Sequence, residues 1–495
     1  MKRALAVKTI FLMLSLAFSH NSFSADSTNE NQQSIDDVLQ GFDEPAIKDS
    51  SEIDQILEGF DSSTPGESNS IDDVLGGFDQ LNSKTIESDP ENIETPRAWD
   101  LINLFSISSS YNFQHKKPET NQTDFRGLSR LKLKLQPEFR YQFNKRWDTV
   151  ISASGFYDLA YRINSRSDYT SQVLDAYEWE MEVREVYLRG TITSSLDIKL
   201  GRQVVVWGKS DSIRVVDVLN PLDFREPGMV DIEDLRLPVT MVKTDYYFSD
   251  WNLSAMLIPE VRENKRPAFG SDFYFGNPNQ PPSEENEPEF GSLEYALALI
   301  GTFSGWDTSF HFASVYDDTP YLTQDNTLDY SRLMLFGFAN NVALGNWLLK
   351  SELAYLNGIL FNQLPDEYNR ADVMLGVDYS GFTNTTLSVE AVTRRITNYD
   401  NVLSIQPNFV EKDEGQIAFR YNANFLREKL DTTLLISLLG YTLEDGAFYR
   451  ASLSYELMDA MSILFGFIVY QSGDSQLSKV VANNDRVFMD WRYSF

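Results

Sequence analysis

Hydrophobic and polar residues alternate with a period of two along most of the chain from residue 97 onward. The segment from Arg130 to Phe143, RLKLKLQPEFRYQF, places leucine and aromatic residues on one face and charged residues and glutamine on the other. The segment from Tyr449 to Leu457, YRASLSYEL, repeats the arrangement. Because successive side chains of a strand point to opposite faces, the pattern predicts strands with one face suited to lipid and the other to water.

The connections between these segments differ regularly in length. Eight short turns, many carrying an aromatic residue, alternate with nine longer polar loops. This arrangement predicts 18 strands, with 16 as the nearest alternative, and both ends of the body on the periplasmic side. Strands in a bilayer must close to satisfy their edges, so we expect residues 97–495 to form an all-β, antiparallel transmembrane barrel. A secreted β-propeller is the competing fold, but no repeat of blade length occurs in the body.

The two ends of the chain carry targeting signals. A basic start, a short apolar stretch and small residues up to Ala25 predict a signal peptide over residues 1–25, too short to span a membrane. The last strand ends on an alternating aromatic row, Trp491, Tyr493 and Phe495, which resembles the signal that the barrel assembly machinery reads. We therefore expect a barrel in the lipid of the cell outer membrane, with the segment before it in the periplasm.

The segment over residues 26–96 differs from the body in composition. It carries 19 acidic and 2 basic residues, is poor in aromatic residues and is rich in serine and asparagine. Such a segment cannot bury enough apolar surface to fold alone. We expect it to be a disordered, acidic periplasmic tail.

Three copies of one decamer interrupt this tail, at residues 34–43, 52–61 and 70–79, with a spacing of 18 residues. Four apolar positions of each copy fall at i, i+3, i+4 and i+7, which predicts one apolar helix face. These residues are Ile35, Val38, Leu39 and Phe42; Ile53, Ile56, Leu57 and Phe60; and Ile71, Val74, Leu75 and Phe78. Such short helices order mainly on binding. We expect the repeats to dock a periplasmic or inner-membrane partner, with an inert spacer as the alternative.

One connection of the body is too long and too apolar for a solvated loop. Residues 208–236 contain the segment VVDVLNPLDF together with charges of both signs. Loops of this length are usually functional or disordered, and the apolar content argues against disorder. We expect an inward-folded constriction or plug, with polar lumen residues around it. The expected lumen residues are Arg184, Glu185, Arg202, Gln203, Trp207, Lys209, Arg214, Asp217, Asn220, Asp223 and Arg225. These residues can brace the barrel wall, contact a transported molecule, or do both.

The same region carries a family resemblance. The matching elements are Arg184-Glu185 with Tyr187, Gly201-Arg202-Gln203, Trp207-Gly208, Asn220-Pro221 with Asp223, and Pro227 with the run to Pro238. They resemble a large proteobacterial outer-membrane barrel family of unknown function, distantly like alginate-export porins. The resemblance implies work beside inner-membrane permeases of the resistance-nodulation-division type, in the branch that moves lipids and other hydrophobic molecules.

The sequence offers no pattern for catalysis or for a cofactor. It has no cysteine, and no hydrolase elbow, metalloprotease, phosphate-loop or calcium-loop motif occurs. His115 and His311 stand without a surrounding motif. The chain is acidic, with a formal net charge of −31, and its basic residues are dispersed, which argues against nucleic-acid binding. We expect neither an enzyme nor a metal protein.

Three functions remain open at this point. The first is the outer-membrane component of a trans-envelope system for export or for transfer of lipids and hydrophobic molecules, with the tail docking its partner. The second is a stand-alone porin-like diffusion channel for a small solute. The third is a surface anchor or recognition protein. The family resemblance favours the first.

Overall fold

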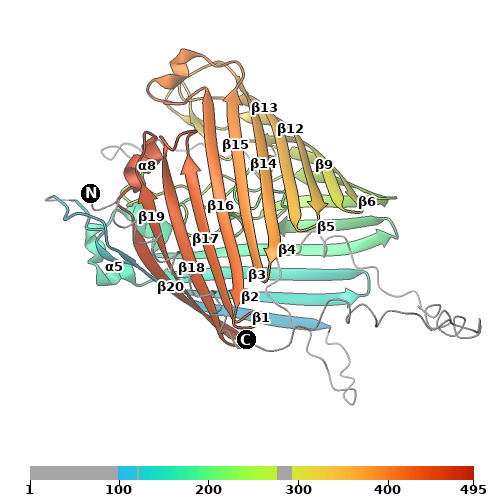
Figure 1. The fold of residues 1–495 in the computed structure, drawn as a ribbon, viewed down its shortest axis with the longest axis horizontal. Coiled ribbons are helices and arrows are strands. Elements are labelled where there is room, and N and C mark those ends of the chain that lie inside the picture. The colour runs from blue at the N-terminus through green and yellow to red at the C-terminus, as the bar shows by residue number, and fades with distance from the viewer. Residues whose placement is uncertain (1–97, 120–121, 276–291) are drawn as a thin grey trace, which may run out of the picture. The chain divides into compact units, whose positions relative to one another are not determined.

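The computed structural model describes residues 98–119, 122–275 and 292–495, and only the backbone at positions 232 and 233. Within these residues the chain forms one 18-stranded antiparallel sheet that closes on itself (Figure 1). The predicted fold class and strand number are therefore confirmed. The signal peptide, the acidic tail and its three repeats lie outside the described residues.

The elements follow the expected alternation of strands, short turns and long loops. The barrel strands are β1 (Trp99–Asn112), β2 (Gly127–Asn144), β3 (Trp147–Asp158), β4 (Trp179–Thr193), β5 (Leu196–Gln203), β6 (Val239–Phe248), β7 (Trp251–Ile258), β8 (Glu294–Phe303), β9 (Trp306–Tyr316), β12 (Arg332–Leu344), β13 (Trp347–Ile359), β14 (Tyr368–Phe382), β15 (Thr385–Ile396), β16 (Asp413–Phe425), β17 (Leu430–Leu439), β18 (Gly446–Met458), β19 (Met461–Gln471) and β20 (Arg486–Ser494). The long loops hold β10 (Tyr321–Leu322), β11 (Leu328–Asp329), α5 (Ala160–Ile163), η2 (Arg166–Asp168), α6 (Ser171–Tyr177), α7 (Ile232–Leu235), η3 (Asn401–Ser404) and α8 (Gln476–Val481).

The barrel closes where its first and last strands meet. Leu104 of β1 pairs with Ser494 of β20, and the pairing runs on to Asn112 and Arg486. The backbone N–H of Asn103 donates to the carbonyl of Phe495 at 2.8 Å, and the N–H of Phe495 donates back at 3.0 Å. The C-terminal aromatic row therefore forms part of the closing seam, and both ends of the barrel lie at the rim of the short turns.

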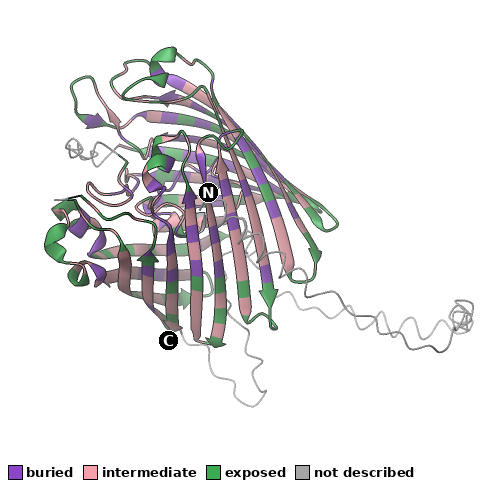
Figure 2. Cartoon of the chain, turned by 60° about the vertical axis from the view of Figure 1, so that its left-hand side comes forward, coloured by how far each residue is buried: buried purple, intermediate pink, exposed green. Residues whose placement is uncertain are grey.

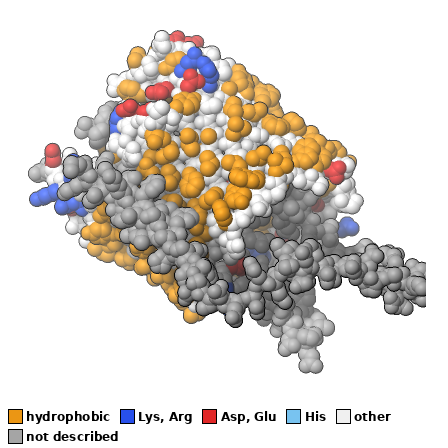
Figure 3. All heavy atoms as spheres, in the orientation of Figure 1, with side chains coloured by type: hydrophobic (Ala, Val, Ile, Leu, Met, Phe, Trp, Pro, Cys, Tyr) orange, Lys and Arg blue, Asp and Glu red, His pale blue; other side chains and the backbone are white. Residues whose placement is uncertain are grey.

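The strands present an apolar face outward and a mixed face inward. Along β13, Leu349, Leu353 and Tyr355 are exposed, whereas Lys350 and Glu352 between them are buried. Figure 2 shows this alternation along the strands, and Figure 3 shows hydrophobic side chains spread over the outer surface with charges gathered near the loops. No helix in the described part of the chain is long and apolar enough to cross a membrane.

Candidate functional site: the loop-filled lumen

The connection between β5 and β6, residues 204–238, folds into the barrel. Asn220 holds its two ends together and is fully buried. Its Oδ1 accepts from the backbone N–H of Val205 at 2.8 Å, and its Nδ2 donates to the carbonyl of Leu237 at 2.8 Å. One side chain thus satisfies two buried backbone groups that would otherwise be costly. Asn220 therefore links the two ends of the loop at its base.

The first half of the loop packs on the inner wall as a hydrophobic core. Trp207 is 5% exposed, and its ring centroid lies 4.6 Å from that of His311 on β9. Val216 is completely buried against Gly337 of β12, where an added Cβ would lie 2.9 Å from its Cγ1. These residues share one cluster with inward-facing apolar side chains from β6 to β16. A water-filled lumen offers no such surface, because a porin interior is polar.

Two carboxylates of the opposite wall hold the loop backbone. Glu352 of β13 accepts from the N–H groups of Lys209, at 2.5 Å, and Ser210, at 2.8 Å. Glu390 of β15 accepts from the N–H groups of Asp211 and Ser212 at 2.9 and 3.0 Å. Both carboxylates are 1% exposed. Hydrogen bonds to a charged acceptor are stronger than neutral ones, so this part of the loop is fixed from several sides.

Lysine side chains complete this anchorage. The Nζ of Lys350 on β13 lies 2.5 Å from Asp211 of the loop and 2.8 Å from Asp378 of β14. Lys209 of the loop pairs with Asp307 of β9 at 2.5 Å. Each of these two lysines therefore has a carboxylate partner, which offsets the cost of burying its charge.

The second half of the loop reaches the far side of the lumen. Asp231 pairs with Arg450 of β18 at 3.0 Å and with Arg420 of β16 at 3.5 Å. Arg225 pairs with Glu180 of β4 at 2.8 Å. Glu226 pairs with Arg130 of β2. Contacts with strands on all sides mean that the loop crosses the lumen.

The electrostatics of Glu226 agree with this position. Burial raises the pKa of its carboxyl, but the positive charges of Arg130, Lys132 and Arg486 outweigh burial and hold the pKa at about 2. The carboxylate is therefore charged at neutral pH and strongly bound to the wall. The loop carries an internal ion cluster as well, since Asp217 pairs with Arg236 at 2.9 Å and with Arg214 at 3.3 Å.

A second loop folds inward beside the first. Residues 259–275, after β7, place Arg262 and Lys265 against Glu182 of β4. Phe273 is 1% exposed and lies 6.0 Å from the ring of Tyr470. The carboxylate of Glu182 attracts these two cations and draws this part of the loop inward.

Most of the expected lumen residues take part in the network. Trp207, Lys209, Arg214, Asp217, Asn220 and Arg225 make the contacts given above. Asp223 accepts from Arg225 at 2.9 Å, and Glu185 accepts from the N–H of Val204 at 3.3 Å. Gln203 is fully buried at the base of the loop. Arg184 has no hydrogen bond or ion pair within the described residues.

Arg202 does not lie in the lumen as expected. It pairs in the sheet with Val186, whose side chain is exposed on the outside, whereas its neighbour Gln203 pairs with the buried Val239. Adjacent residues of one strand point to opposite faces, so Arg202 and Gln203 cannot both face inward. Arg202 instead pairs with Glu260 beyond the end of β7.

Sequence reasoning missed the wall residues that bind the loop. Glu352 lies in WLLKSELAY and Glu390 in LSVEAV, where each is a carboxylate at an inward position between apolar neighbours. That position is a usable signal, because an inward charge beside an apolar row needs a partner. The partners themselves lie 136 to 180 residues away in sequence. No group of three or more His, Asp or Glu side chains in the described ranges is arranged to hold a metal ion.

Comparison with known families identifies the chain. Residues 80–495 match the family described as Protein of unknown function (DUF1302). The match covers most of the sequence, so the chain belongs to this family, and the resemblance to an outer-membrane barrel family of unknown function is confirmed. Among curated proteins, none matches this sequence.

Three solved structures are similar to this chain over most of its length. OccAB2 of Acinetobacter baumannii is 9% identical with a TM-score of 0.48. OpdK of Pseudomonas aeruginosa, solved with vanillate, is 11% identical with a TM-score of 0.48. A BenF-like porin from Pseudomonas fluorescens Pf-5 is 11% identical with a TM-score of 0.49. Each comparison covers 80% of this chain and 98% of the other.

Proposed function

We propose that this member of the family is a gated conduit of the outer membrane, closed by the loop of residues 204–238. In this proposal it passes hydrophobic or amphiphilic molecules as the outer component of a trans-envelope system. The observation that carries the proposal is the packing of the loop, which buries Trp207 and Val216 on the inner wall and spans to Asp231 on the far side.

The chemistry of the lumen supports an amphiphilic cargo over a small polar solute. Apolar positions such as Met241, Met256 and Leu335 face inward and are buried under the loop. When the loop moves away, these positions form an apolar lining that favours hydrophobic groups. Displacing the loop must also break its ion pairs, so opening requires a partner or a ligand to offset the loss.

The acidic tail provides the docking element of this proposal. Each repeat presents four apolar residues on one predicted helix face, for example Ile35, Val38, Leu39 and Phe42. Three weak sites on one tether raise the overall affinity through effective concentration. A periplasmic or inner-membrane transporter of the resistance-nodulation-division type is the partner that the family resemblance implies.

Current through planar bilayers tests the closed lumen. We expect the full chain to give small, infrequent openings and the double variant Glu352→Ala/Glu390→Ala to give steady currents at least tenfold larger. Glu456→Gln serves as the control, because Glu456 on β18 faces inward without a contact to the loop among the described residues. Large, steady currents from the unmodified chain would overturn the proposal.

Removal of the repeat side chains tests the docking. We expect Phe42→Ala/Phe60→Ala/Phe78→Ala to abolish retrieval of an inner-membrane permease from solubilised envelopes while bilayer currents stay unchanged. Equal retrieval by this variant and by the unmodified chain would leave the tail as a spacer.

A stand-alone diffusion channel is the second candidate, and one observation favours it. Lys132, Lys134 and Arg184 face the lumen from β2 and β4 without an ion pair among the described residues, and their positive charge would favour anions along this wall. A channel of this kind would give steady, anion-selective currents that are independent of the tail.

A further inference from the structure

The wall formed by β2, β3 and β4 is interrupted at mid-height. The β2–β3 ladder pairs Leu135 with Gly155 and then Glu138 with Ser152, and the two residue pairs between them are missing. Pro137 lies in this gap, and proline has no N–H to donate to a neighbouring strand. Other register shifts among the described strands lie next to strand ends, apart from the one on β4.

That shift on β4 lies beside the gap. Ile151 of β3 pairs with Val186 and Ala153 pairs with Val183, so two residues of β4 stand opposite Ser152. This is a β-bulge, which bends the strand and weakens the local ladder. The two irregularities are adjacent across β3, and together they make one seam of reduced backbone pairing.

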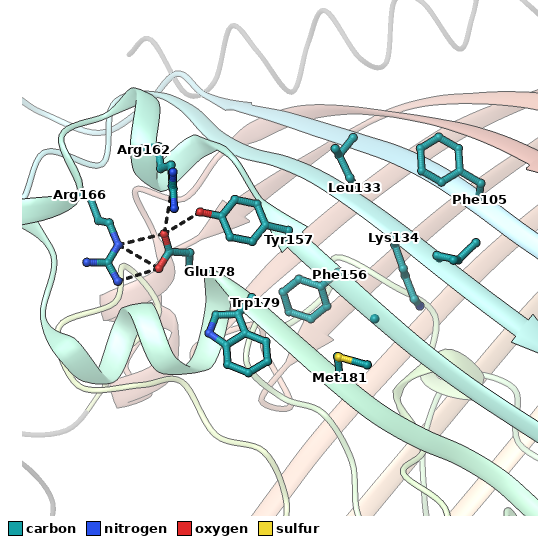
Figure 4. A pocket seen from close by; sticks show the side chains of 12 residues that line it. Phe105, Leu133, Lys134, Phe156, Tyr157, Arg162, Arg166, Glu178, Trp179 and Met181 are labelled. Carbon is teal, nitrogen blue, oxygen red and sulfur yellow. Dashed lines mark hydrogen bonds and ion pairs between the residues drawn. The ribbon is translucent and has the colours of Figure 1, made fainter.

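An open groove of about 870 Å³ lies on the outside of the same strands. Its lining includes Phe105, Leu135 and Met181, which belong to the lipid-facing side, and Gly155 leaves room between them. Figure 4 shows the apolar side chains along the strands and the charged Arg162, Arg166 and Glu178 at one end. The groove therefore suits an extended acyl chain, and its polar end lies at the loop rim.

Unpaired cations lie behind the seam, on the lumen side. Lys132 and Lys134 alternate with the outward leucines of β2, and Arg184 lies in the bulge of β4. Within the described residues none of the three has a carboxylate within ion-pair distance; Lys132 stacks on Phe156, 4.1 Å from its centroid, and acts on Glu226 only over a longer distance. Nearby Glu182 is already shared by Arg262 and Lys265. Excess positive charge in a partly dry site favours an anion.

We propose that this seam is a lateral passage for a long-chain anionic amphiphile, which moves from the lumen to the bilayer. Its headgroup would bind Lys132, Lys134 and Arg184 while its chain enters the outer groove over Gly155. Because it names the cargo of the conduit, this inference rests on the proposed function. The three features meet at one place in the wall, and an anionic amphiphile suits all three.

Labelling with a defined probe tests the passage. The full chain in phosphatidylcholine nanodiscs is exposed to lysophosphatidylglycerol with a photoreactive diazirine at the chain end. We expect the diazirine at the end of the acyl chain to label Leu135 or Met181. We expect the lipid headgroup to protect Lys132 and Lys134 from acetylation at least fivefold. Zwitterionic lysophosphatidylcholine should give no lysine protection.

A disulfide across the seam separates passage from simple lipid contact. The chain has no native cysteine, so Gln136→Cys/Ser154→Cys adds one pair at the gap. Oxidation should remove the lysine protection, and reduction should restore it. The matched control is Ala418→Cys/Ser437→Cys, an inward pair in the continuous β16–β17 ladder, which should change nothing.

Filling the groove gives a second, milder variant. An added Cβ at Gly155 would lie 3.5 Å from Met181 Cγ, an ordinary contact, so Gly155→Leu should fold and reduce groove labelling about tenfold. Groove labelling without lysine protection, unchanged by the disulfide, would overturn the passage and leave annular lipid only. Bilayer currents test the closure of the lumen by the loop, whereas the labelling tests the lateral passage. The two proposals can therefore fail independently.

Discussion

Two sides of the barrel wall differ in how their inward-facing charges are paired and in the continuity of their strand ladders. On β13–β15, inward charges such as Glu352 and Lys350 are buried and occupied by the loop, and the strand ladders are continuous through the middle of the wall. On β2–β4, Lys134 and Arg184 have no partner among the described residues, and the ladder is interrupted near Pro137. The inward charges of the first side hold the loop. The second side holds it through Arg130 and Glu180 and leaves Lys134 and Arg184 available to a ligand.

The comparison teaches that charge alone does not mark a functional position in a barrel. A buried charge with its partners in place is structural, since removing one partner leaves the other uncompensated. A lumen charge without a partner lowers the stability of the fold, because no ion pair or hydrogen bond offsets its partial loss of hydration. Such a charge is the better candidate for contact with a transported molecule.

The largest expected difference is between two lumen lysines. Lys350→Gln leaves Asp211 and Asp378 without their shared cation and should lower the free energy of loop opening by about 3–5 kcal/mol. Lys134→Gln removes an unpaired charge and should change it by less than about 0.5 kcal/mol. Hydrogen exchange of the loop amides measures both. Equal effects of the two substitutions would remove the distinction between the two sides.

A smaller effect is expected at the base of the loop. Asn220→Ala leaves the N–H of Val205 and the carbonyl of Leu237 buried without a partner, at a cost of about 2 kcal/mol. Bilayer currents should then show more frequent openings of unchanged size. Asp234→Ala is the control, because this exposed aspartate lies in the same loop; currents that match in the two variants would argue against Asn220 as the closure.

The smallest effect is that of pH. The pKa of Glu226 is about 2 in the folded loop and 4.5 when exposed, so its stabilising contribution is complete above pH 4.5 and is lost as pH falls through about 2. Currents should stay constant between pH 7 and 5 and rise below pH 4. In Glu226→Gln this acid step should be reduced, and opening of the unmodified chain near pH 6 would contradict the assignment.

Much of the fold can be predicted from the sequence, because the alternation of side chains along a strand is visible within a few neighbouring residues. The alternation of Leu131, Lys132 and Leu133 is enough to assign both faces of β2. The inward loop also follows, since VVDVLNPLDF cannot remain in water at low cost. The same alternation should have excluded Arg202 from the lumen, and the neighbouring Gln203 misled the prediction.

The anchoring of the loop could not be predicted in the same way. Glu352 and Glu390 bind backbone groups that lie at least 136 residues away in sequence, and nothing local specifies which loop satisfies them. The seam at Pro137 has a local signal, since proline is disfavoured within a sheet. Its meaning depends on the bulge of β4 and on the groove outside, which only the assembled wall brings together.

The position of the loop of residues 204–238 is the central claim, and a disulfide tests it most directly. An ideal Cβ at Gly337 lies 3.3 Å from the Cβ of Val216, close to the separation in natural disulfides. In outer membranes, Val216→Cys/Gly337→Cys should crosslink nearly completely and shift mobility on a non-reducing gel, and Val216→Cys/Leu375→Cys, whose second site faces lipid, should not. A reduced first pair, or equal crosslinking of both pairs, would show that the loop does not lie against β12 inside the barrel.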